Sequence, residues 1–109
     1  MSNFICDTCG EEVLPIDGIV SWTKENKTMS NFKLTHKNPV GQKIGCQPDN
    51  NRYRELYTLT LAHGYLDFVL YLLGNWENNF LLSGDAGLRK VMTQLNFHIH
   101  EKLLMLIEE

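Results

Sequence analysis

No stretch of this sequence is apolar enough, over a sufficient length, to cross a bilayer. The longest apolar run, YLDFVLYLLG, contains Asp67 and is shorter than the ~20 residues that a transmembrane helix needs. A secretory signal peptide is lacking as well, because Asn3, Cys6 and Asp7 interrupt any apolar run near the start. We therefore predict a soluble, cytoplasmic protein without a membrane partner.

Cysteine is scarce and its number is odd. The chain has three cysteines in 109 residues, whereas a secreted disulfide framework would normally pair all of them. In a reducing cytoplasm the same residues more plausibly hold a metal. The chain also lacks a large net charge of either sign. Its net charge of −3 is too small to indicate the kind of partner that it binds. The balance of 43% hydrophobic and 21% charged residues is that of a globular chain of one domain.

The first half of the chain is typical of strands and turns. Gly18 to Trp22 is β-branched and aromatic and follows a turn signal, and Asn31 to Lys37 alternates apolar and polar residues. The polar segment TKENKTMS between them predicts a β-hairpin with a longish loop. The next segment, NPVGQKIGCQPDNN, is rich in glycine, proline and asparagine and predicts a loop.

The second half is typical of helices. The range 51–73 lacks proline and carries apolar residues at helical spacing, with Gly64 marking a close helix contact. A second helix is predicted from about Ala86 to Glu108. The fold class is therefore α+β, with a small zinc-bound β-hairpin lobe over residues 1–48. An antiparallel helical hairpin over residues 49–109 packs on this lobe, so that both form one compact domain.

The two predicted helices carry more apolar surface than a small lobe can cover. Pairing two helical hairpins into a four-helix bundle would cover it, so we expect a homodimer or a dedicated protein partner. The residues expected at this interface are Leu59, Leu66, Leu70, Leu95, Ile99 and Leu106.

The segment CDTCG predicts a zinc knuckle, in which two thiolates converge on one cation. A tetrahedral zinc site needs two further ligands, and His36 and Cys46 are the obvious candidates downstream. The predicted site is Cys6, Cys9, His36 and Cys46, with a structural zinc ion as the default over iron. His63 or Asp49 would replace Cys46 if it is not the fourth ligand. A redox pair and simple buried thiols are the alternative interpretations of the motif.

The CDTCG motif, together with His36 and Cys46, resembles zinc-ribbon and treble-clef-like modules over about the first 47 residues. This resemblance implies a structural zinc ion and a role in nucleic-acid or protein binding. The predicted helical hairpin is not part of that pattern.

Lysines gather in the first half and predict a possible nucleic-acid surface. Aromatic residues Trp22 and Phe32 could stack on unpaired bases beside them, although solvated lysines on a small lobe are the alternative explanation. The residues concerned are Lys24, Lys27, Lys33, Lys37 and Lys43.

A catalytic site is weakly indicated by His63 and Asp67, which should share a helix face. Such a pair is more often a hydrogen bond on a buried helix than an acid–base site. We therefore expect a non-enzymatic regulatory, adaptor or inhibitor protein that acts through protein–protein interaction. The alternatives are a nucleic-acid-binding regulator that uses the lysines and, less favoured, an enzyme that uses His63 and Asp67.

Overall fold

The computed structural model describes residues 4–39, 45–83 and 87–107. It combines strands and helices, which confirms the predicted α+β class. Strands β1 (Phe4–Ile5) and β2 (Glu12–Val13) form a small antiparallel ribbon, followed by the 3-10 turn η1 (Pro15–Asp17). The main sheet has the strand order β5-β3-β4-β6.

The centre of this sheet is an antiparallel hairpin of β3 (Gly18–Glu25) and β4 (Thr28–His36). Its connection is not the longish loop that the polar segment predicts but a turn of two residues. Asn26 and Lys27 both have positive φ, of 51° and 63°, which is the conformation that matches the twist of the flanking strands. The strands therefore extend through the polar residues on both sides of the turn.

The helix predicted over 51–73 is wrong in its first part. Residues Arg52–Glu55 form strand β5, which pairs antiparallel with β3 and gives the sheet its outer strand. One helical turn, α1 (Leu56–Leu59), follows, and the long helix α2 begins only afterwards and covers Ala62–Glu77. Gly64 lies at the junction, where a Cβ would collide with the carbonyl oxygen of Thr58, so the expected close contact is there and is made by α1.

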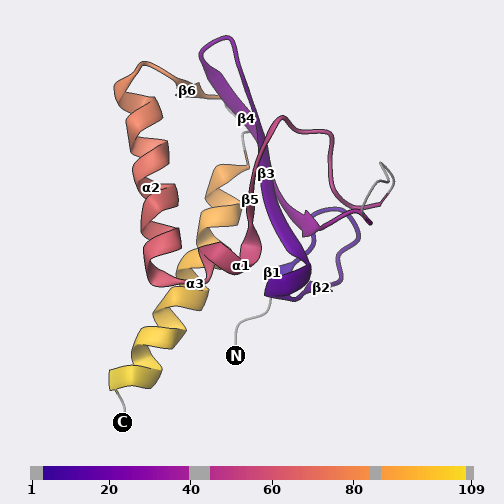
Figure 1. The fold of residues 1–109 in the computed structure, drawn as a ribbon, viewed down its shortest axis with the longest axis vertical. Helices are drawn as coiled ribbons and strands as arrows, with labels where there is room; N and C mark the ends of the chain where they lie inside the picture. The colour runs from indigo at the N-terminus through magenta and orange to yellow at the C-terminus, as the bar shows by residue number, and fades with distance from the viewer. Residues whose placement is uncertain (1–3, 40–44, 84–86, 108–109) are drawn as a thin grey trace.

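Two further elements complete the chain. The short strand β6 (Leu81–Leu82) runs parallel to β4, and α3 (Leu88–Ile107) lies within the range predicted for the second helix. Figure 1 shows α2 and α3 on the same side of the sheet, running in opposite directions and crossing at an angle. Tyr65 of α2 donates a hydrogen bond to Asn96 of α3, and α3 packs against β4.

The core lies between the sheet and the two helices. Trp22 of β3 stacks on Phe32 of β4 with ring centroids 5.5 Å apart, and Phe68 of α2 contacts the same indole at 5.5 Å. All three side chains are buried, and Val91 and Leu95 of α3 close the core from the other helix. In the part of the chain that the structure describes, no helix has both the length and the apolar character to cross a membrane.

Two of the residues predicted to lie at an interface are buried inside the chain. Leu59 and Leu95 are 1% exposed and belong to the core of the chain itself, so they cannot contact a partner. Leu66 and Leu70 are 57% and 63% exposed on α2. Ile99 is partly buried, and the side chain of Leu106 lies outside the described part. The division of the chain at residues 48 and 49 stays a prediction.

Candidate metal centre

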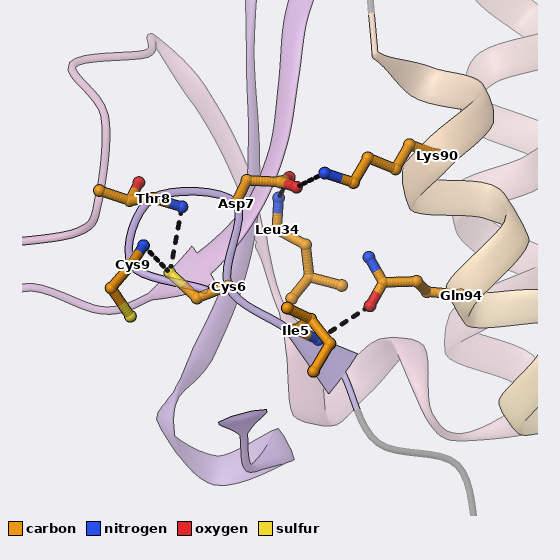
Figure 2. A network of polar contacts seen from close by, with 8 residues as sticks. All are labelled: Ile5, Cys6, Asp7, Thr8, Cys9, Leu34, Lys90 and Gln94. Atoms are coloured by element: carbon orange, nitrogen blue, oxygen red, sulfur yellow. Dashed lines mark hydrogen bonds and ion pairs between the residues drawn. The ribbon is translucent and has the colours of Figure 1, made fainter. Parts of the chain in front are cut away.

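The first two cysteines lie in a tight turn that follows β1. The N–H of Gly10 donates to the carbonyl of Cys6 at 3.0 Å, and Gly10 has a φ of +79°, a conformation that side chains disfavour. The N–H groups of Thr8 and Cys9 point at the Cys6 Sγ, at 3.4 and 3.5 Å (Figure 2). Backbone donors aimed at a sulfur stabilise its thiolate, which is the form that binds a metal.

His36 ends β4 and is held in one orientation. Its Nε2 lies 2.9 Å from the carbonyl oxygen of Glu12. Because a carbonyl only accepts, Nε2 carries the proton and the lone pair is on Nδ1. That Nδ1 lies 3.6 Å from the Cys9 Sγ. A histidine ligand whose other ring nitrogen donates to a backbone carbonyl is the usual arrangement in metal sites.

Cys46 reaches the same place from the loop that follows β4. Thr8 Oγ1 donates to the carbonyl of Cys46 at 2.7 Å, which ties the loop to the turn of the first two cysteines. Paired hydrogen bonds between Asn38 and Gln47, at 3.1 and 3.0 Å, close the base of the loop. The fourth predicted ligand is therefore positioned by its neighbours.

The end of this loop is fixed to the sheet. Asn50 accepts a hydrogen bond from Thr23 Oγ1 at 2.7 Å and donates to Ser21 Oγ at 3.0 Å. In Figure 1 residues 45–51 run along the side of the sheet that faces away from the helices. The segment that carries Cys46 is thus held to the rest of the fold on both sides of that residue.

The ligand atoms of Cys6, Cys9, His36 and Cys46 all lie within 4.8 Å of one another. Four ligands at 2.0–2.3 Å from a tetrahedral zinc ion are separated by about 3.5–3.8 Å. The cluster is slightly wider than this, and small rotations of the side chains would bring the four atoms onto one ion. The four residues therefore form a group that could hold a metal ion, and none of the three cysteines is in a disulfide.

The chain matches no family model, no curated protein and no solved structure. The geometry of the four side chains therefore carries the interpretation of the site. The reserve ligands, His63 and Asp49, are not part of the cluster, because Cys46 fills the fourth position.

The pKa values of Cys6, Cys46 and His36 are shifted in different directions. Burial raises the pKa of Cys6, but hydrogen bonds from the backbone N–H groups of Cys9, His36 and Thr8 and the interaction with the His36 side chain outweigh this effect and lower the pKa to about 6. Burial, followed by hydrogen bonds to the other two thiols, raises the pKa of Cys46 to about 11. The side chain of Cys6 raises the pKa of His36.

Zinc binding at neutral pH is expected to release protons. Cys46, with its pKa near 11, must lose a proton to become a ligand, whereas Cys6, with its pKa near 6, is already mostly ionised. As the pH falls, His36, whose pKa is raised above its ordinary value, takes up a proton first, and Cys6 follows near pH 6, so the zinc affinity should fall steeply. Calorimetric titration with zinc in buffers of different ionisation enthalpy counts the protons released. An affinity that stays constant between pH 7 and pH 5.5 would contradict this assignment.

A residue that the sequence analysis did not single out links the turn to the rest of the fold. Asp7 lies between the two cysteines, and its side chain is 5% exposed. Its Oδ2 accepts the N–H of Leu34 at 2.8 Å, and its Oδ1 pairs with Lys90 Nζ at 2.7 Å. Gln94, one turn further along α3, accepts the N–H of Ile5 at 2.9 Å (Figure 2). The candidate metal centre is thereby tied to β4 and α3.

The lysines of the predicted set that the structure describes make different contacts. Lys37 forms an ion pair with Glu55, Lys24 and Lys27 lie against the ring of Phe80, and Lys33 is partly buried on β4. Lys43 lies outside the described residues. Trp22 and Phe32, which were to stack on bases, are 1% exposed, so the stacking role predicted for them is wrong.

His63 and Asp67 share the start of α2, as predicted, and both are exposed. No hydrogen bond joins them in the described part of the chain, and they belong to no group of potential metal ligands found there. The structure therefore adds nothing to the case for an acid–base pair.

Proposed function

We propose that this chain is a small non-enzymatic regulatory, adaptor or inhibitor protein that self-associates and is held together by a structural zinc ion. The exposed face of α2 is the observation that carries the proposal. Leu66, Leu70, Leu73 and Trp76 follow one another at helical spacing and are 57%, 63%, 47% and 69% exposed. Soluble monomers seldom expose a continuous apolar stripe of this kind, and such stripes mark interaction sites.

Zinc is the metal that best suits the donor set. Three thiolates and one imidazole favour zinc, and four protein ligands leave no open position for a substrate water. This arrangement supports a structural role and a zinc-ribbon or treble-clef-like description of the first half. A cytoplasmic location would keep the three free thiols reduced.

Nucleic-acid binding is the second candidate, and it rests on fewer residues than the sequence predicts. Lys24, Lys27 and Arg54 gather around the exposed end of the main hairpin and the C-terminal half of α2. A nucleic-acid complex formed by these residues would weaken steeply with added salt, whereas an apolar dimer would not.

Replacing both Leu66 and Leu70 by Glu is expected to convert a dimer into a monomer. Two carboxylates buried in an apolar interface have no counter-charge and must be desolvated, which opposes association. Sedimentation velocity over a range of protein concentrations measures the change.

The matched control replaces Leu14 and Ile16 by Glu. These two residues are 55% and 66% exposed near η1, away from the stripe, so this variant should dimerise like the wild type. A wild-type chain that stays monomeric, or a dimer that both variants preserve, would reject the role of α2 in self-association.

A further inference from the structure

A second apolar feature lies beside the stripe, at the end of the sheet where α2 stops and α3 begins. A cavity of about 180 Å³ opens there between α2, β4, β6 and the first turn of α3. Its lining is mainly apolar. The lining residues are Met29, Leu72, Trp76, Phe80, Leu81, Leu82 and Leu88.

The size of the cavity suits one large apolar side chain. An engineered apolar cavity of about 150 Å³ takes up benzene, so a cavity of about 180 Å³ has room for a leucine or phenylalanine side chain. Leu81 and Leu82 are 62% and 48% exposed at the cavity, so it is open to solvent. An apolar group from outside can therefore reach it.

Positive charge gathers around the same place. The Nζ atoms of Lys24 and Lys27 lie 4.5 and 4.7 Å from the ring centroid of Phe80, which lines the cavity. The guanidinium of Arg54 lies 5.1 Å from the ring centroid of Tyr71, and the Nζ atom of Lys24 lies 5.5 Å from the same centroid. The two rings hold these three cations in place through cation–π attraction.

These charges are not neutralised within the described part of the chain. None of Lys24, Lys27 and Arg54 forms an ion pair with a carboxylate there. Glu77, the last residue of α2, is not among the residues that line the cavity, but it lines a neighbouring hollow that shares Trp76 with it. A protein of net charge −3 therefore presents a local cationic rim beside an apolar cavity.

We propose that this cavity docks a short acidic segment of a partner protein. One apolar side chain of the segment fills the cavity, and carboxylates on either side of it contact Lys24, Lys27 and Arg54. Charge complementarity at the rim provides orientation and speeds association, and the buried apolar anchor provides affinity. The inference rests on the proposed function, since it names the chemistry of the partner of an adaptor protein.

A peptide suits this site better than a nucleic acid does. The lining is mainly apolar, and the indole N–H of Trp76 is the one side-chain hydrogen-bond donor among the lining residues. A nucleobase in the cavity would therefore leave most of its hydrogen-bonding edge unpaired, at a cost in free energy. A phosphate backbone could contact the lysines but would leave the cavity empty.

The experiment is a selection of random dodecapeptides displayed on phage against the zinc-loaded full-length chain. We expect the enriched peptides to carry one large apolar residue flanked by Asp or Glu. A synthetic copy of the best peptide should bind about tenfold more weakly to Lys24→Glu, by loss and reversal of one rim charge, and its affinity should fall as salt rises.

Lys33→Glu is the matched control, because Lys33 lies on the same hairpin outside the cationic rim and its substitution changes the net charge equally. Leu82→Glu, at an exposed position of the cavity, should abolish binding of the peptide. The proposal is overturned if no peptide is enriched, if the enriched peptides lack acidic residues, or if Lys24→Glu and Lys33→Glu weaken binding equally. Displacement of the peptide by a single-stranded oligonucleotide would overturn it in favour of nucleic acid.

Failure of this test is distinguishable from failure of the proposed function. Self-association through Leu66 and Leu70 is measured without any peptide. If the dimer depends on those leucines but no acidic peptide binds the cavity, the proposed self-association stands and the peptide-docking proposal is rejected. Dissociation of the dimer by Leu82→Glu alone would show that a second copy of the chain covers the cavity, which also overturns the peptide proposal.

Discussion

Removing the metal with a strong chelator is expected to lower the midpoint of thermal unfolding by about 10 °C or more. Structural zinc contributes ~10–16 kcal/mol of apparent free energy in small modules, which is comparable with the whole stability of a small domain. Without it, the turn that carries Cys6 and the loop that carries Cys46 are joined by the hydrogen bond from Thr8 to the Cys46 carbonyl but by no shared ion. Differential scanning calorimetry before and after chelation measures the effect.

Cys9→Ser is the variant that reproduces this loss without a chelator. Cys9 is exposed and its side chain packs on little else, so replacing its sulfur removes a ligand while leaving the core intact. The variant should unfold at the temperature of the chelated wild type, and added zinc should raise that temperature little. If chelation leaves the unfolding midpoint of the wild type unchanged, the metal has no structural role.

Asp7→Ala is expected to lower the free energy of unfolding by about 2–3 kcal/mol, the range for hydrogen bonds to a buried charged group. The substitution removes the acceptor of the Leu34 N–H and the partner of Lys90, which lie 2.8 and 2.7 Å away. Zinc affinity should fall as well, because Asp7 holds the turn between the two cysteines against β4. Urea denaturation of the zinc-loaded protein measures the first effect, and competition with a metal indicator measures the second.

Lys90→Met and Asp7→Asn separate the two partners of the carboxylate. The Asn side chain can still accept a hydrogen bond from the Leu34 N–H. Asp7→Asn should therefore lower the free energy of unfolding less than Asp7→Ala does. Lys90→Met removes only the ion pair. The Lys90 side chain is 69% exposed, so its own share should be small. Equal stability of Asp7→Ala and the wild type would show that this network does not join the turn to β4 and α3.

The four residues of the candidate metal centre could be predicted because their chemistry is visible in the sequence. Two cysteines at knuckle spacing followed by Gly10 allow few local structures, and His36 and Cys46 were the remaining candidates downstream. Asp7 was missed because its role depends on Leu34 and Lys90, which are distant in the sequence. An acidic residue between two knuckle cysteines was the only available signal.

The strand β5 shows where helical periodicity misleads. Arg52–Glu55 has no β-branched residue, so local preference gave little reason to end the helical prediction there. Pairing with the free edge of β3 determines its conformation, and the sequence does not reveal that edge.

The predicted interface failed in part for a similar reason. Apolar spacing along a helix shows which residues share a face but not which face the sheet covers. In α2 the sheet covers Phe68, and Leu66 and Leu70 lie outside, whereas Leu95 of α3 lies in the core. The lysine prediction has the same limit. The closeness of the lysines in sequence did not show that Lys37 forms an ion pair with Glu55, or that Arg54 and Lys24 lie at the same ring, Tyr71.

X-ray absorption at the zinc edge of the purified, zinc-loaded protein tests the central claim most directly. We expect one zinc ion per chain with three sulfur neighbours at about 2.3 Å and one nitrogen neighbour at about 2.0–2.1 Å. The Cys46→Ser variant should lose one of the three sulfur neighbours. A zinc ion surrounded only by oxygen and nitrogen, or a chain that binds no stoichiometric metal, would contradict the assignment of Cys6, Cys9, His36 and Cys46 as one metal centre.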